Sequence, residues 1–161
     1  MNCRPLFKKR KQCGSIHCIF YSLILFLFFS ACSSNNERSS IECAPYARKL
    51  TGVNLRGYAY SWWYQSFGKY IHTKRPQAGA ILVFRRTHHL PLGHVSVVEK
   101  VENSRRILVD HANWQPRHIN HAAPIFDVSS KNDWSLVKVW WPPTDKMGSR
   151  KYSTYGFILP R

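Results

Sequence analysis

The sequence predicts an α+β domain in which N-terminal helices pack on an antiparallel β-sheet. Segments with helical character come first, and segments rich in β-branched and aromatic residues follow from about residue 80 onward. Helices and strands that are segregated in this way, instead of alternating, favour an antiparallel sheet. The length of 161 residues leaves room for one domain, and contents of 44% apolar and 14% aromatic residues are typical of a folded domain.

Two helices are expected in the first half of the domain. The first covers residues 45–51, because proline suits the first turn of a helix and Gly52 supplies its end. Ser39 and Glu42 offer an alternative, a capping box with an earlier start, which would place the proline inside the helix. The second helix is expected over residues 58–65, between two glycines.

The strands expected in the second half share β-branched and aromatic residues and are separated by Gly, Pro, Asn and Asp. They are residues 80–84, 94–101, 107–114, 136–141 and 155–160.

The N-terminus has the pattern of a secretory signal. Basic residues precede an apolar stretch over residues 19–29, and small residues follow it. An uncleaved membrane anchor is the alternative, but a span usually needs about 20 apolar residues. The boundary FSAC resembles the lipobox of bacterial lipoproteins, which predicts a signal peptide over residues 1–31 and a lipid on Cys32. Residues 32–41 would then be a tether, and the protein would be exported and held at the periplasmic side of a bacterial membrane.

Cleavage at this boundary changes the meaning of the five cysteines. Cys3, Cys13 and Cys18 leave with the signal and Cys32 carries lipid, so Cys43 remains as the single thiol. An unpaired thiol in an oxidising compartment is a candidate nucleophile. A Cys32–Cys43 disulfide in a form without lipid is the alternative.

The formal net charge of +16 restricts the class of partner. Such a charge suits a substrate with peptide carboxylates, and it equally suits anionic lipid or wall polymer. A nucleic-acid binder would also be basic, but the export signal and the absence of a recognition motif argue against that class.

A thiol near a helix N-terminus, followed by a histidine on a strand, is an arrangement that can perform nucleophilic catalysis. The helix dipole and the imidazole of His94 would both favour thiolate, so the pKa of Cys43 is expected well below the ~8.5 of a free cysteine. His94 would act as general base and later protonate the leaving amine. Taken alone, His94 could also be an ordinary histidine at the entry to a strand.

The order of the sequence blocks is similar to that of the CHAP domain family, the cysteine, histidine-dependent amidohydrolases/peptidases. The resemblance covers nearly all of residues 42–161 and consists of Cys43 opening a helix, followed by RPQAGAILVF, GHVSVVEKV, ILVDHANW and YGFILP. It implies a papain-like catalytic domain over residues 42–161 that cleaves amide bonds of peptidoglycan, as an amidase or an endopeptidase. It also implies Cys43 as nucleophile and His94 as base, with no metal or organic cofactor.

The third catalytic position departs from the family pattern. Relatives commonly have Glu, one residue, then Asn, and this chain has His111 and Asn113 there. Strand alternation places both side chains on one face and Asp110 on the other. The expected order of partners for the His94 ring is therefore Asn113, then His111, then Asp110. Trp114 is expected to shield the His94–Asn113 bond from water or to edge a substrate groove.

Two other classes of function stay open from the sequence. The first is a catalytically silent basic lipoprotein that binds the cell wall, which the loss of the family Glu favours and the joint presence of Cys43, His94 and Asn113 opposes. The second is a zinc site built from His88, His89 and His111, whose spacing matches no known motif.

Overall fold

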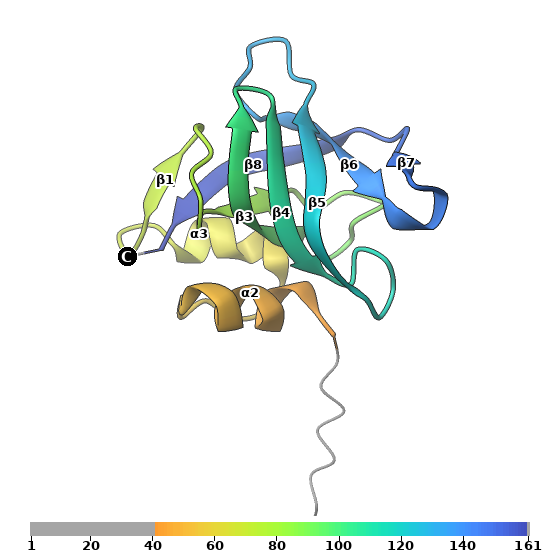
Figure 1. Cartoon of the computed structure of the whole chain (residues 1–161). Helices are drawn as coiled ribbons and strands as arrows, with labels where there is room; N and C mark the ends of the chain where they lie inside the picture. The colour runs from red at the N-terminus through yellow and green to blue at the C-terminus, as the bar shows by residue number, and fades with distance from the viewer. Residues whose placement is uncertain (1–40, 161) are drawn as a thin grey trace, which may run out of the picture. The chain divides into compact units, whose positions relative to one another are not determined.

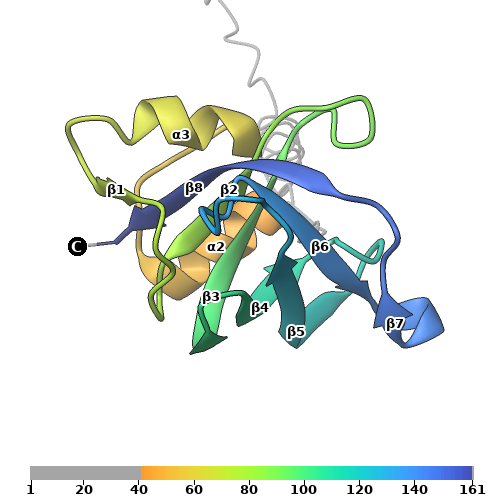
Figure 2. The same ribbon diagram turned by 90° about the horizontal axis from the view of Figure 1, so that it is seen from above.

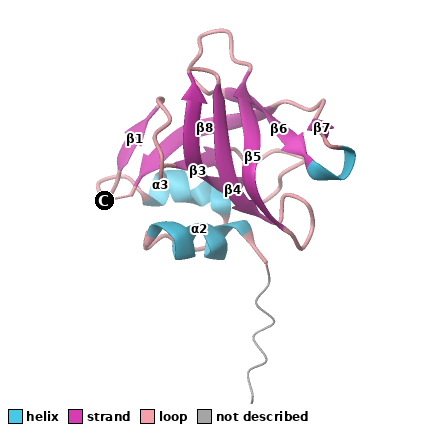
Figure 3. Cartoon of the chain, in the orientation of Figure 1, coloured by secondary structure: helices cyan, strands magenta, loops and turns pink. Residues whose placement is uncertain are grey.

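The computed structural model of the chain describes residues 41–160, and β-strands are the main regular secondary structure of that segment (Figure 3). The expected signal peptide over residues 1–31 and all but the last residue of the expected tether lie outside the described residues. Within residues 41–160, no helix is both long enough and apolar enough to cross a membrane.

The strands form one antiparallel sheet that closes on itself (Figures 1 and 2). The sheet order is β1-β8-β2-β3-β4-β5-β6-β7, and an additional pairing of β8 with β6 completes a closed barrel. The closing pairs are Leu136 with Ser153 and Val137 with Tyr152. The strands are β1 (Ile71–Thr73), β2 (Ile81–Phe84), β3 (His94–Asn103), β4 (Arg106–Ala112), β5 (Ile119–Asp127), β6 (Leu136–Trp141), β7 (Lys146–Met147) and β8 (Tyr152–Leu159).

The α-helices of the described chain are short. They are α2 (Cys43–Thr51) and α3 (Trp62–Gln65), with 3₁₀ turns η1 (Ala59–Ser61) and η2 (Pro142–Thr144). The antiparallel sheet is as expected, but the predicted layer of N-terminal helices packed on an open sheet is not what forms. The dominant element is the barrel, and α2 packs mainly against the β3 and β4 part of it (Figure 1).

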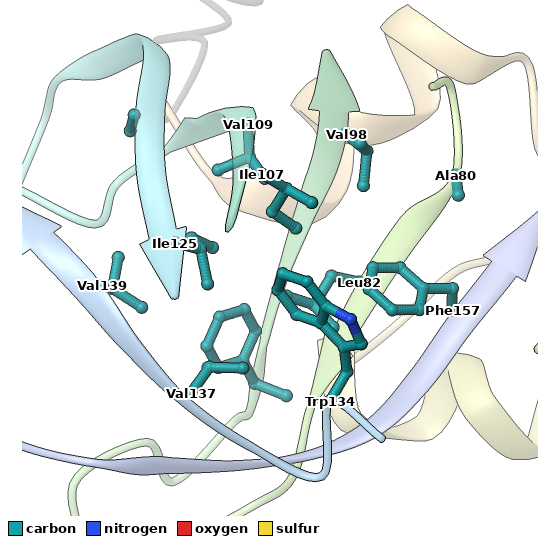
Figure 4. Packing of buried hydrophobic residues seen from close by; sticks show 12 residues of the cluster. Ala80, Leu82, Val98, Ile107, Val109, Ile125, Trp134, Val137, Val139 and Phe157 are labelled. Atoms are coloured by element: carbon teal, nitrogen blue, oxygen red, sulfur yellow. The ribbon is translucent and has the colours of Figure 1, made fainter. Parts of the chain in front are cut away.

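The interior of the barrel is filled by apolar side chains from strands around its circumference (Figure 4). Trp134, which lies between β5 and β6, is 1% exposed and packs edge-on against Phe157 of β8. Burial of such large side chains stabilises the fold by roughly 2–3 kcal/mol each. The other members labelled in Figure 4 are Ala80, Leu82, Val98, Ile107, Val109, Ile125, Val137 and Val139.

A second apolar cluster lies outside the barrel, between the helices and strands β2 and β3. Ala44 and Ala47 of α2 pack there with Ile81 and Val83 of β2. Leu82 and Phe84 of the same strand point into the barrel, so β2 is buried on both faces. This explains why it is a continuous apolar run and not an alternating pattern.

Several elements differ from the sequence prediction: β1, β5 and β7 were not predicted, and the helix predicted over residues 58–65 forms as η1 followed by α3. Helix α2 begins at Cys43, two residues before the expected start, because proline is tolerated in the first turn, where its missing N–H has no helical partner. Strand β5 was not predicted, because its segment contains Pro124. Strand β6 pairs only with residues 125–127 of β5, so Pro124 has one unpaired side, and such a position can accept proline.

Candidate active site

The first turn of α2 and the start of β3 meet at a cavity of about 550 Å³. Cys43 and His94 both line it, although 50 residues separate them in the chain. The rest of the lining is mostly apolar and aromatic, as in most small-ligand sites. Its residues are Glu42, Ala44, Pro45, Gly57, Tyr58, Ala59, His89, Leu90, Pro91, Leu92, Gly93, Asn113, Trp114, Trp141 and Tyr152.

Cys43 is the first residue of α2 and is a free thiol in the described part of the chain. Burial raises its pKa, and the negative charge of Glu42 adds to this effect. The nearby backbone N–H groups of Val95, Ala44 and Cys43 itself lower the pKa and oppose the shift without cancelling it. The expectation of a depressed thiol pKa is therefore wrong in direction, because desolvation outweighs the helix N-terminus here. The Val95 contact also shows that the thiol lies against the residue that follows His94.

His94 and His111 form a buried pair at the end of the barrel. Nε2 of His94 lies 3.3 Å from Nδ1 of His111, and the side chains are 4% and 0% exposed. Burial, reinforced by the neighbouring His111, lowers the pKa of His94 well below its ordinary value. Burial lowers the pKa of His111 to about 4, although Asp110 works in the opposite direction. Both rings are therefore neutral at neutral pH.

Aromatic side chains enclose this histidine pair. Trp114 stacks on the His111 ring with centroids 5.6 Å apart and meets the His94 ring edge-on at 5.0 Å. Phe84 packs edge-on against His94, and Tyr152 packs edge-on against Trp114. Trp114 thus shields the bond between the histidines, and it also lines the cavity. The contact that Trp114 covers is between His94 and His111, and not the expected bond between His94 and Asn113.

Asn113 does not contact the His94 ring in the way that strand alternation suggests. Strand β4 ends at Ala112, and Asn113 takes a left-handed conformation with φ 60°, so the alternation stops one residue before it. Its Nδ2 donates to Oε2 of Glu42 at 3.1 Å, and its Oδ1 accepts from the backbone N–H of Arg117 at 2.9 Å. His111 occupies the place beside His94 that was expected for Asn113.

Asp110 points away from the histidine pair, as alternation predicts. Its Oδ1 accepts from the backbone N–H of Ala122 at 3.0 Å and lies 3.4 Å from Nδ1 of His121. Asp110 therefore affects the pair only through the field of its charge.

The turn before β3 fixes the direction of His94 and requires glycine. Gly93 has φ 68°, and a Cβ atom there would lie 2.7 Å from the backbone nitrogen of Tyr60. That nitrogen donates to the carbonyl of Leu92 at 3.2 Å, so the two segments are held together at this point. No side chain fits without moving the start of β3.

Within residues 41–160, no cluster of three or more His, Cys, Asp or Glu side chains has the arrangement of a metal site. The zinc set of His88, His89 and His111 is not assembled there: His88 and His89 pack against each other, and His111 pairs with His94.

Sequence reasoning missed three parts of the site. Glu42 was considered only as a helix-capping residue, yet it lines the cavity beside the thiol. Tyr152 and the loop of residues 89–92 also belong to the wall. The loop carries a signal, since Pro91 and Leu92 of LPLG, next to His94, are apolar residues that are exposed.

Acid should destabilise the fold through His111. A histidine whose folded pKa is lowered stabilises the protein above the unfolded pKa of about 6.5, and this contribution is lost as pH falls toward the folded value. With a folded pKa of about 4, the loss amounts to about 3 kcal/mol between pH 6.5 and pH 4. Urea unfolding of the wild type and His111→Gln at pH 7 and pH 4 measures it. The variant should lose about 3 kcal/mol less, and equal losses would show that His111 is not buried as a neutral ring.

The fold and the cavity define a cysteine–histidine site at one end of a closed antiparallel barrel. The CHAP domain family matches residues 33–113, half of the 161-residue chain, and this segment includes Cys43, His94, His111 and Asn113. The chain belongs to the CHAP domain family.

Among solved structures, the chain is similar to an N-acetylmuramoyl-L-alanine amidase from Staphylococcus aureus. The identity is 23%, the TM-score is 0.41, and the match covers 51% of this chain and 27% of that chain. The chain thus corresponds to little more than a quarter of that protein's length. No curated protein matches the chain significantly.

Proposed function

We propose that the chain is an exported peptidoglycan hydrolase that cleaves amide bonds with Cys43 as nucleophile and His94 as general base. The observation that carries the proposal is that both side chains line one cavity in a member of the CHAP domain family. Residues 42–161 would form the catalytic domain, with no requirement for a metal or an organic cofactor.

The protonation states support a reaction that starts from a neutral thiol and a neutral imidazole. The pKa of Cys43 is raised and that of His94 is lowered, so a preformed thiolate–imidazolium pair is disfavoured before substrate binds. The thiol proton would pass to His94 as the sulfur attacks the amide carbonyl. The same proton would then go to the leaving amine, an acyl-enzyme would form, and water would release it.

The histidine pair would select the tautomer that this reaction needs. If Nε2–H of His94 donates to Nδ1 of His111, the lone pair of His94 is at Nδ1 and can accept the thiol proton. His111 then carries its own proton on Nε2, which is buried without a partner within the described chain. His111 would thus act as a positioning residue in place of the family Glu, without supplying a negative charge.

The developing oxyanion would lie at the N-terminus of α2. The first backbone amides of a helix lack intrahelical partners, and the amide of Cys43 is one of them. Such donors stabilise an oxyanion because they are already oriented before the reaction.

A wall-digestion experiment tests the proposal. Purified peptidoglycan sacculi from several wall chemistries are incubated with the reduced protein, and the released fragments are analysed by mass spectrometry. New amino groups and soluble fragments are expected, and the fragment masses distinguish amidase from endopeptidase. If no fragments are released from any wall, the silent wall-binding lipoprotein becomes the preferred function and the hydrolase proposal is wrong.

We further propose that the mature protein begins at a lipid-modified Cys32, on the periplasmic side of a membrane, on the strength of the FSAC boundary. Cys32→Ala should release the protein from the membrane fraction or stall its processing, because acylation at this cysteine is the proposed anchor. Fractionation with mass spectrometry of the N-terminus measures this. Unchanged membrane partitioning of Cys32→Ala would contradict the lipid anchor and leave a cleaved soluble form or an uncleaved span.

A further inference from the structure

Glu42 stands out in the wall of the cavity because of its charge. It is the only Asp, Glu, Lys or Arg among the lining residues, all of which lie in the described part of the chain. The whole chain has 24 Lys and Arg against 8 Asp and Glu. A strongly basic protein therefore presents a single carboxylate beside its candidate nucleophile.

The carboxylate is held in position by a neutral group. Nδ2 of Asn113 donates to Oε2 of Glu42 at 3.1 Å. The backbone N–H of Arg117 donates to Oδ1 of Asn113, which fixes the amide with its donor end toward Glu42. This contact uses one carboxylate oxygen and leaves Oε1 available.

Among residues 41–160, the charge of Glu42 has no cationic partner. The ion pairs among residues 41–160 join Arg105 with Asp127, Arg106 with Glu102, and His121 with Asp110. Glu42 also makes no side-chain hydrogen bond that caps α2, so helix capping does not account for it. Its field reaches the sulfur, because it is one of the causes that raise the pKa of Cys43.

We infer that Glu42 is a specificity residue that binds a substrate ammonium group close to the scissile amide. This inference rests on the proposed amide hydrolysis and adds the class of substrate: a wall peptide with a free amine near the bond to be cut. The amine can be the α-amino group of the peptide or the side-chain amine of a basic amino acid.

An ammonium on Glu42 would also assist the reaction. Neutralising the carboxylate removes one cause of the unfavourable thiol ionisation, so the correct substrate would promote formation of the nucleophile. Such coupling is reciprocal: ionisation of Cys43 would strengthen the binding of the ammonium.

The sign of the expected effect separates this idea from bulk electrostatics. Acetylation of the free amines makes the wall more anionic, and a basic protein should then bind it more tightly. A site that needs the ammonium predicts the opposite, a loss of activity on the acetylated wall.

The experiment compares the full-length wild type, Glu42→Gln and Glu99→Gln on native sacculi and on sacculi acetylated with acetic anhydride. Glutamine can still accept from Asn113 and removes only the charge. Glu99 is an exposed residue of β3 outside the cavity, so Glu99→Gln makes the same charge change elsewhere. Fragment release is followed over time, and synthetic stem peptides acetylated either at the α-amine or at the side-chain amine identify which amine is bound.

We expect the wild type and Glu99→Gln to lose about tenfold in kcat/KM on acetylation, mostly through KM, as for a charge-assisted contact. Glu42→Gln should cleave both walls at equal rates. Equal or faster cleavage of the acetylated wall by the wild type overturns the inference and leaves the hydrolase proposal intact. If the wild type cleaves neither wall, both the Glu42 inference and the hydrolase proposal are overturned.

Discussion

Cys43→Ala is expected to abolish wall cleavage, while the fold and wall binding survive. The thiol would supply the electrons of the new bond to carbon, and alanine has no group that can replace it. Cys43 packs against the second apolar cluster, outside the barrel core, so its removal leaves that core intact. We expect a loss of at least about a thousandfold in fragment release, consistent with removal of a nucleophile in other hydrolases.

The control for this prediction is binding. Cys43→Ala should bind purified sacculi as the wild type does and should give the same circular dichroism spectrum. A wild type and a Cys43→Ala variant with identical effects on sacculi would contradict the enzyme proposal. Because the pKa of the thiol is raised, iodoacetamide labelling of the wild type should increase steeply on the alkaline side of neutral pH.

The second large effect is expected at His111. Loss of the partner that holds the His94 ring should lower kcat by about a hundredfold in His111→Ala, as for other groups that orient a general base. His111→Gln retains a group that can accept from Nε2 of His94 and should retain more of the activity. Turnover on sacculi and thermal unfolding of the variants separate a catalytic loss from a loss of folding.

Asn113→Ala is the comparison that tests the assignment. Since Asn113 contacts Glu42 and not His94, its removal should act mainly on KM and leave kcat within a few-fold of the wild type. Asp110→Asn should change both constants little, because Asp110 faces away from the pair. A larger kcat loss at Asn113 than at His111 would show that the histidine pair is not the catalytic arrangement.

The sequence predicted the parts of the site that depend on local signals. Cys43 lies at a helix start and His94 opens a strand, because glycine, proline and β-branched residues mark those boundaries in the chain. The partner of His94 was misassigned because alternation holds only inside a strand. Asn113 lies just beyond β4, and asparagine tolerates its left-handed conformation.

Other features depend on contacts between distant segments and leave no local signal. Closure of the barrel depends on two residue pairs between β6 and β8. The raised thiol pKa depends on how deeply the rest of the domain buries the start of α2, which no pattern within α2 encodes. Strand β5 was missed because a proline that disfavours a central strand is acceptable where one neighbour is absent.

The barrel is closed by a short contact between β6 and β8 that consists of two residue pairs. Tyr152 belongs to this closing contact because it pairs with Val137. It also packs on Trp114, which in turn stacks on His111 of the histidine pair. Local opening of this contact would therefore expose Trp114, and the His111 ring on which it stacks, to solvent. The burial of the histidine pair and the closure of the barrel thus depend on the same few residues.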